Sequence, residues 1–282
     1  MFPLGFYFII FGTMQNEKLV ERQTLQSAFL QREVILDFYF PLGIKSLDGL
    51  ELLLINDGQD LVTMNFQRIL SDLYEQDLIE PLWCVGIHCG VDRKNEYGTA
   101  NVLNDKGQGA KAELYTRFIF EELMPFIRKE FMISSFSHKS ICGFSLGGLS
   151  ALDIAWNHPK EFLNVGVFSG SLWWRSVDQN DPSFSEDKHR IIHNEIKKGG
   201  FYPWLKFFFE TGTLDETADR NNNGIIDSID DTLALINELE KKGYDAAKDI
   251  RYVEMKNGGH NVPTWAIAFP EFLKWGWGKK IE

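Results

Sequence analysis

Short apolar runs alternate along this chain with longer stretches in which apolar residues recur every three or four positions. The short runs are typical of buried strands, which we expect at 51–55, at 85–87, at 139–142, in a run ending at Phe168, at 204–210 and at 250–255. The longer stretches predict helices at 111–131, 149–156 and 264–275. Strands that alternate with amphipathic helices favour an α/β fold, in which a mostly parallel sheet is covered by helices on both faces.

The domain organisation follows from the absence of breaks in this pattern. The sequence has no internal repeat, low-complexity tract or long linker, so we expect its 282 residues to form one domain, 1–282. Residues 176–187 are rich in Asp, Ser and Pro and precede a helical stretch. The segment 176–200 is therefore expected to form either a small, mobile cap or a plain surface loop. The stretch 216–242 is expected to be an insertion within the domain.

A Gly-Phe-Ser-Leu-Gly sequence at 143–147 lies between the strand expected at 139–142 and the helix expected at 149–156. A strand, a tight G-x-S-x-G turn and a helix make up a nucleophile elbow, in which a strained serine exposes its hydroxyl at the carboxyl edge of the sheet. We therefore predict that Ser145 is a nucleophile. The alternative is a glycine-rich turn whose serine only caps the helix.

A serine nucleophile needs a base and a carboxylate, and after a nucleophile elbow these follow in the order acid, then histidine. Of the six histidines, His260 fits best, because it follows the strand at 250–255 and two glycines that allow a sharp loop. The acid should follow the preceding strand, at 204–210. Asp215 is the candidate there, with Glu210 and Glu216 as competitors and a turn-capping role as the alternative.

Two backbone N–H groups should stabilise the oxyanion that forms when serine attacks a carbonyl. One is expected from Leu146, directly after the nucleophile. The other should come from a loop after an early strand, where Asn56-Asp57-Gly58-Gln59 follows the run 51–55. We predict the Gln59 amide as the second donor, although Asn-Asp-Gly also forms ordinary turns.

Taken in order, these motifs resemble those of the esterases of the enterochelin-esterase and esterase D type. This branch of the α/β-hydrolases also holds feruloyl esterases and the antigen 85 mycolyltransferases. The resemblance spans about 24–277 and rests on residues 56–59, 85–87, 92–97, 121–127, 143–148, 168–171, 212–215 and 259–260. It implies an α/β-hydrolase fold, a triad of Ser145, Asp215 and His260, and oxyanion donors at Gln59 and Leu146. These are the residues that the motif search selects on its own.

One stretch departs from that family pattern. Residues 219–230 match the D-x-[DN]-x-[DN]-G calcium-loop template, and a helix is expected at 232–242. A single structural Ca²⁺ of modest affinity is therefore predicted, while catalysis itself needs no cofactor. The alternative is an Asn- and Gly-rich surface turn. The predicted ligands are Asp219, Asn221, Asn223, the carbonyl of Ile225, Asp227 and Asp230.

Side chains on the loops above the sheet are candidates for contact with a substrate. Trp173 and Trp174 follow the strand that ends at Phe168 and could form an apolar wall. Arg93, Glu96 and Tyr97 follow the strand at 85–87 and could orient a polar group. For all five residues, packing at the surface is the competing interpretation.

Charge and cysteine content limit the partners. A net charge of −11 argues against nucleic acid and against an anionic membrane surface. Cys84 and Cys142 lie in expected strands and are interpreted as core residues, so no disulfide is predicted. Residues 1–11 are apolar but too few to span a bilayer, and they lack the basic start of a signal peptide. They are interpreted as an edge strand or an extension, and the chain is expected to be cytoplasmic.

The predicted function is a serine carboxylic-ester hydrolase that acts on a small-molecule ester, with siderophore or carbohydrate esters as candidates. Three alternatives stay open: an acyltransferase with the same triad, a thioesterase of the S-formylglutathione hydrolase type, and a binding scaffold without activity. The identity of the ester and the oligomeric state have no readable pattern in the sequence.

Overall fold

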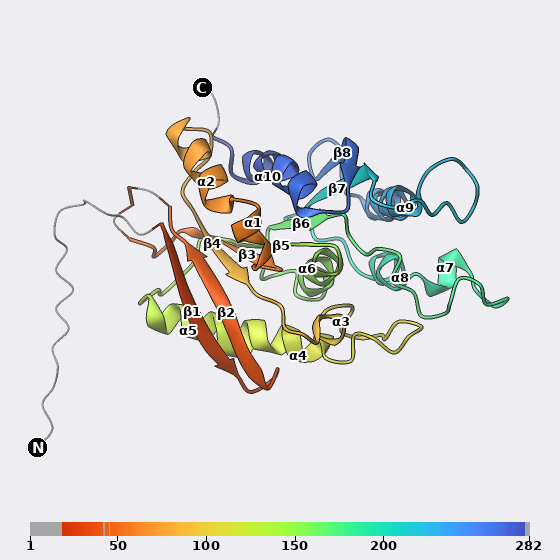
Figure 1. Ribbon diagram of the computed structural model, residues 1–282, viewed down its shortest axis with the longest axis horizontal. Coiled ribbons are helices and arrows are strands. Elements are labelled where there is room, and N and C mark those ends of the chain that lie inside the picture. Colours follow the sequence, from red (N-terminus) through yellow and green to blue (C-terminus); the bar gives the residue numbers. More distant parts are fainter. Residues whose placement is uncertain (1–18, 42, 45, 280–282) are drawn as a thin grey trace, which may run out of the picture.

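The computed structural model describes residues 19–41, 43–44 and 46–279 (Figure 1). The described residues form one eight-stranded sheet in the order β1-β2-β4-β3-β5-β6-β7-β8. The strands are β1 (Val20–Ser27), β2 (Arg32–Tyr39), β3 (Glu51–Asn56), β4 (Leu82–Ile87), β5 (Lys139–Phe144), β6 (Asn164–Phe168), β7 (Lys206–Leu214) and β8 (Ile250–Gly259). In this order, neighbouring strands from β4 to β8 pair in parallel. Strand β2 pairs antiparallel with both of its neighbours, β1 and β4. The predicted α/β-hydrolase fold, with a mostly parallel sheet, is confirmed.

Helices cover both faces of this sheet (Figure 1). Residues of α1, α2 and α10 pack in one hydrophobic cluster, and residues of α4, α5, α6, α8 and α9 pack in the other. The helices are α1 (Asp60–Thr63), α2 (Phe66–Glu75), α3 (Arg93–Glu96), α4 (Ala112–Arg117), α5 (Met124–Glu130), α6 (Leu146–Asn157), α7 (Glu186–His189), α8 (Ile191–Lys198), α9 (Asp227–Lys242) and α10 (Val262–Trp277).

The two-residue period of a strand explains how one sheet serves two cores. On β3, Leu52 and Leu54 belong to one cluster, and Leu53 and Ile55 belong to the other. All four are fully buried. Burial of such a side chain stabilises the fold by about 1.5–3 kcal/mol, so the sheet is a rigid platform for the loops at its edge.

The helix expected at 111–131 forms with one irregular turn. A π-helical turn, η1 (Phe118–Leu123), joins α4 to α5. Pro125 lies in the first turn of α5 and has no N–H to donate to the preceding turn. A wider turn just before it accommodates the missing hydrogen bond, which a spacing argument alone does not reveal.

The remaining structural expectations have mixed outcomes. Cys84 and Cys142 are buried, and all three cysteines are free thiols. In the segment 176–200, α8 packs into the main core through Ile192 and Ile196, whereas 176–185 is irregular. Among the described residues, no helix combines the length and the apolar character needed to cross a bilayer. The prediction for 1–11 lies outside the described residues.

Candidate active site

Ser145 forms a strained turn between β5 and α6. Its backbone has φ +55° and ψ −120°, a conformation that side-chain-bearing residues rarely adopt. The turn is held on both sides, because the Ser145 N–H donates to the Phe168 carbonyl at 2.8 Å and the Ser145 carbonyl accepts from Gly148 at 3.1 Å. This is the local geometry expected of a nucleophile elbow.

The glycine at position 147 allows α6 to approach the turn after β3. A Cβ there would collide with the Asp57 carboxylate and press on the Asn56 side chain. The Asn56 amide instead donates to the Gly147 carbonyl at 2.9 Å, and its oxygen accepts from the Tyr115 hydroxyl at 2.7 Å. The two segments predicted to supply oxyanion donors are therefore fixed against each other.

The sheet register brings the predicted residues to one edge. Phe144 pairs with Phe168, and Leu214 pairs with Gly259. Ser145 and Ser169 therefore follow paired positions, as do Asp215 and His260. Since these strands are parallel, all four residues emerge at the carboxyl edge of the sheet.

A cavity of about 90 Å³ lies at this edge, and Asp215 and His260 both line it. Its other lining residues are Ser169, Gly170, Trp173, Glu216 and Ser228. Ser145 is not one of the lining residues, and its hydroxyl lies 3.4 Å from that of Ser171. Within the described residues, no hydrogen bond joins Ser145, His260 and Asp215. Catalytic hydrogen bonds are often long until substrate is bound.

Electrostatics at the cavity favour a neutral base. His260 keeps exposed surface. Desolvation nevertheless lowers its pKa, the charge of Asp215 raises it, and the charge of Arg93 lowers it further. Burial raises the pKa of Asp215, whereas the charge of His260 opposes that rise. Both carboxylate oxygens of Asp215 are buried without a hydrogen-bond donor among the described residues. An imidazole N–H would satisfy one of them.

Glu210, the competing candidate for the catalytic acid, differs from Asp215 in its protonation. It is buried, and burial together with the charge of Asp215 raises its pKa to about 8. The Ser169 hydroxyl, which accepts from the Trp265 indole at 2.9 Å, lies 3.5 Å from the Glu210 carboxyl. Glu210 is therefore protonated near pH 7, and a neutral carboxyl stabilises an imidazolium poorly. This argument favours Asp215.

The predicted oxyanion loop is held by side chains from the loop after β4. Arg93 makes two hydrogen bonds of 2.7 Å to the Asp57 carboxylate, and the Tyr97 hydroxyl accepts from the Asp57 N–H at 3.1 Å. Asp57 itself has a positive φ of 60°. Within the described chain, the N–H groups of Gln59 and Leu146 donate to no protein acceptor. They are free to bind a ligand oxygen.

Three of the five predicted substrate contacts are buried instead. Tyr97 and Glu96 are 0% and 1% exposed, and Glu96 pairs with Arg32 at 2.6 Å. Trp174 is 1% exposed and packs in the core. In this structure the surfaces of these three side chains are covered by protein, which agrees with the competing interpretation of packing. Arg93 is partly exposed but held by Asp57, whereas Trp173 does line the cavity.

The predicted calcium loop is closed by its own polar groups. The Asp219 carboxylate accepts from the N–H groups of Asn223 and Gly224 at 3.1 and 2.9 Å. The amides of Asn221 and Asn223 both donate to one oxygen of Asp230 at 2.8 Å.

Two findings bear on the other predicted ligands. Ile225 lies within the loop and is exposed, whereas Asp227 is buried and pairs with Arg220. The helix α9 also begins at Asp227, inside the template, and not at 232 as predicted. The described residues hold no group of three or more His, Cys, Asp or Glu side chains placed to bind a metal.

The sequence argument assigned no role to Ser169 and Ser171. Both lie in the loop after β6, and Ser169 has a positive φ of 43°. The Ser171 N–H donates to the Ser145 carbonyl at 3.1 Å. The sequence signal that could have placed these two serines near the site is a Ser-Gly-Ser sequence directly after a buried parallel strand.

Comparison with known proteins adds a family. A family model described as "Putative esterase" matches residues 27–275. "Uncharacterized protein YjcH" of Bacillus subtilis is 23% identical over 269 residues, which is 93% of this chain and 97% of that protein.

Solved structures with the same fold include a named esterase and a named hydrolase. One is enterochelin esterase from Shigella flexneri, with a TM-score of 0.66, 19% identity and coverage of 92% of this chain. This chain spans only 58% of that protein. The other is the siderophore hydrolase EstB from Aspergillus nidulans, with a TM-score of 0.66, 18% identity and coverage of 94% and 97%. At these identities the likeness establishes the fold.

Proposed function

Because this chain belongs to the Esterase family, we propose that it hydrolyses carboxylic esters of small molecules through Ser145, His260 and Asp215. The observation that carries the proposal is the strained Ser145 turn at the sheet edge from which Asp215 and His260 also emerge. The free amides of Gln59 and Leu146 support it, because they match the two donors that an oxyanion requires.

In the first half of the reaction, neutral His260 accepts the Ser145 proton as the serine oxygen attacks the ester carbonyl. The carbonyl oxygen becomes an oxyanion and accepts hydrogen bonds from the Gln59 and Leu146 amides. The tetrahedral intermediate then breaks its bond to the alcohol oxygen, and His260 gives that oxygen its proton. The products are an acyl-enzyme and a free alcohol.

In the second half, water takes the place of the alcohol. His260 removes a proton from the water, whose oxygen attacks the acyl carbonyl. The intermediate then releases the carboxylic acid, and the proton returns to Ser145. In both halves Asp215 holds the imidazole in the required tautomer and stabilises its charged form.

The test is kcat/KM for p-nitrophenyl acetate and butyrate. Ser145→Ala should lower it roughly a thousandfold or more, because the nucleophile is lost. Ser183→Ala, in an exposed loop, is the matched control and should behave as wild type. Equal rates in wild type and Ser145→Ala would refute the proposal. An added alcohol that diverts the acyl group into a new ester would instead favour the acyltransferase alternative.

We further propose that the loop 219–230 holds one structural Ca²⁺, with no part in the chemistry. The ligand spacing supports it, as does the convergence of Asn221 and Asn223 on Asp230. A cation bound there would be coordinated by the oxygens of these side chains in place of the amide hydrogens.

A further inference from the structure

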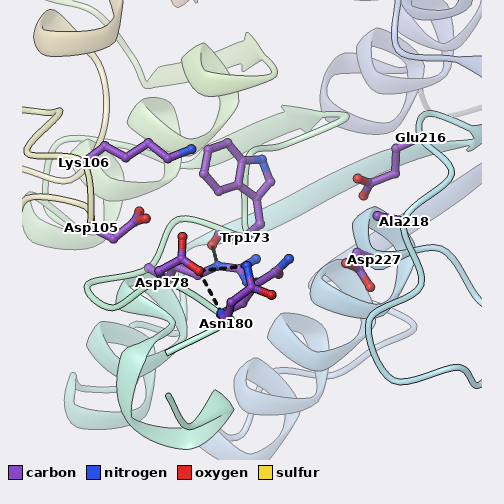
Figure 2. A pocket seen from close by; sticks show the side chains of 10 residues that line it. Asp105, Lys106, Trp173, Asp178, Asn180, Glu216, Ala218 and Asp227 are labelled. Carbon is purple, nitrogen blue, oxygen red and sulfur yellow. Dashed lines mark hydrogen bonds between the residues drawn. The ribbon is translucent and has the colours of Figure 1, made fainter. Parts of the chain in front are cut away.

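A larger cavity adjoins the one that Asp215 and His260 line. Its volume is about 340 Å³, and Trp173 and Glu216 line both cavities (Figure 2). Its walls come from the loop before α4, the loop after β6, and the segment from β7 to the start of α9. The lining residues are Asp105, Lys106, Trp173, Arg175, Asp178, Gln179, Asn180, Glu216, Ala218 and Asp227. An ester bound beside His260 would extend its remaining part into this space.

The cavity is lined by more acidic than basic side chains. Four carboxylates, from Asp105, Asp178, Glu216 and Asp227, face two cationic groups, from Lys106 and Arg175.

Two of these charges are already engaged. Asp227 pairs with Arg220 at 3.3 Å, and Arg175 is 7% exposed and donates to the Trp173 carbonyl at 2.8 Å. Asp105, Asp178 and Glu216 make no ion pair within the described residues. Lys106 and Arg175 make none there either, because a hydrogen bond to a carbonyl leaves the charge of Arg175 in place. The three unpaired carboxylates therefore outnumber the two unpaired cations, and the cavity has an excess of negative charge.

Glu216 lies among other carboxylates. It is half-buried, and among the described residues its carboxylate has no ion-pair partner. Burial raises its pKa, the Ser228 backbone N–H opposes that rise, and the nearby charges of Asp227, Asp231 and Asp215 add to it. Figure 2 shows its carboxylate on the side of the residue that faces the Trp173 ring. Both residues line both cavities. A positive group beside Glu216 would relieve the repulsion between these carboxylates.

We propose that the larger cavity binds an ammonium group carried by the ester substrate, and that Glu216 and Trp173 recognise it. The inference rests on the proposed esterase function. Glu216 supplies the opposite charge, and the indole face of Trp173 supplies a cation–π surface. Since both residues also line the cavity at His260, they read the part of the substrate next to the ester. The enzyme therefore prefers cationic esters to neutral ones of equal shape and disfavours anionic esters.

The test compares kcat/KM within sets of esters that differ in charge. On the acyl side, p-nitrophenyl 6-aminohexanoate is cationic, p-nitrophenyl heptanoate is its neutral isostere, and the p-nitrophenyl half-ester of adipate is anionic. On the alcohol side, acetylcholine is compared with 3,3-dimethylbutyl acetate. We expect the cationic member of at least one set to be preferred roughly tenfold, as one desolvated charge contact allows.

Glu216→Gln should bring the ratio of cationic to neutral kcat/KM close to one. Glu240→Gln, on the exposed side of α9, removes the same net charge and should leave that ratio as in wild type. A preference for the anionic ester would overturn the proposal and point to Lys106. A Glu216→Gln variant that slows all esters equally would also overturn it, because Glu216 would then serve the chemistry.

Binding separates this inference from the esterase proposal. If Ser145→Ala hydrolyses every ester as fast as wild type does, the proposed function fails, but the cavity can still be tested. Titration calorimetry of Ser145→Ala with choline and with 3,3-dimethylbutanol should give tighter binding of choline. A second variant that adds Glu216→Gln should lose this difference. Equal or weaker choline binding to Ser145→Ala would refute cation recognition.

Discussion

The charge of His260 decides when Ser145 can be activated, because only the neutral imidazole accepts a proton. Desolvation and the charge of Arg93 lower the pKa of His260, and Asp215 opposes them. We therefore expect kcat/KM for p-nitrophenyl acetate to rise with pH and to reach half its maximum below the ordinary histidine value of about 6.5. A pH–rate profile of wild type measures this midpoint. A midpoint above 6.5 would mean that the charge of Asp215 outweighs desolvation.

Glu210 couples the stability of the fold to pH. Its pKa is raised from 4.5 to about 8, so the folded state retains a proton that the unfolded state loses. The stability from the neutral carboxyl is complete below pH 4.5 and is lost as pH rises to 8. Glu210→Gln keeps a neutral side chain of the same shape. We expect it to be more stable than wild type above pH 8 by at least about 2 kcal/mol, or roughly 4–8 °C in Tm.

Thermal unfolding from pH 4.5 to 9 would measure this difference, which should shrink toward the acid end. Glu254→Gln, on the exposed side of β8, is the control and should follow the pH trend of wild type. A Glu210→Gln variant whose Tm runs parallel to that of wild type would show that Glu210 is ionised in the folded state at neutral pH.

Single residues differ in how well the sequence predicts their positions. Ser145 and His260 were identifiable because short motifs and chain order fix them against strand ends. Tyr97 was not, since a loop aromatic looks the same in sequence whether it faces a substrate or the protein. Its hydroxyl turns inward because the Asp57 N–H needs an acceptor, a contact between residues 40 positions apart.

The turn after β3 depends on the segment that contains Arg93. Arg93→Met removes two hydrogen bonds and the ion pair of the buried Asp57 carboxylate, which keeps only the hydrogen bond from the Gln59 side-chain amide at 3.2 Å. We expect a loss of about 3–5 kcal/mol in unfolding free energy, because a buried charge becomes unpaired, and a fall in kcat as the Gln59 amide moves. Urea unfolding and ester kinetics measure both. Adding Asp57→Asn should recover much of the stability. If Arg93→Met alone is as stable as wild type, the ion pair does not hold the turn.

The calcium loop can be tested by metal removal. With excess CaCl₂ the Tm should exceed that in EDTA by a few degrees, because a ligand that binds only the folded state stabilises it by mass action. Asp230→Ala should lose the effect, since both asparagine amides converge on Asp230. Ester hydrolysis well below Tm should not respond to Ca²⁺. An unchanged Tm together with no calorimetric binding would leave the loop as a surface turn.

Elements were predictable where periodicity is strong, and less so at their ends. The helix expected at 232–242 begins five residues earlier, at Asp227, and its N-cap is Ile226, which has no side-chain oxygen for capping. The helix starts there because the Asp227 N–H reaches the Ala218 carbonyl and its carboxylate accepts from the Arg220 N–H. Tertiary contacts, rather than a local signal, set that boundary.

At the scale of the whole molecule, the order of chemistry along the chain follows from the parallel sheet. Each parallel strand returns the chain to the same edge, so residues after β5, β7 and β8 emerge at one edge although they are far apart in sequence. The hairpin of β1 and β2 was harder to predict. β1 reads Val-Glu-Arg-Gln-Thr-Leu-Gln-Ser and is largely polar, as suits a strand at the edge of the sheet.

The net charge of −11 acts on substrates over a longer range than Glu216 does. A field of that sign repels anionic esters during approach, and salt screens it, since the Debye length falls from about 30 Å at 0.01 M to about 3 Å at 1 M. We therefore expect added NaCl to raise kcat/KM for the adipate half-ester and to leave that for the heptanoate ester nearly unchanged.

Contacts inside the cavity are shorter than the screening length at moderate salt. The preference for the 6-aminohexanoate ester over heptanoate should therefore persist at about 0.1 M NaCl, where the Debye length is about 10 Å, and depend on Glu216. If that preference disappears with salt in wild type and Glu216→Gln alike, its origin is the charge of the whole molecule and not the cavity.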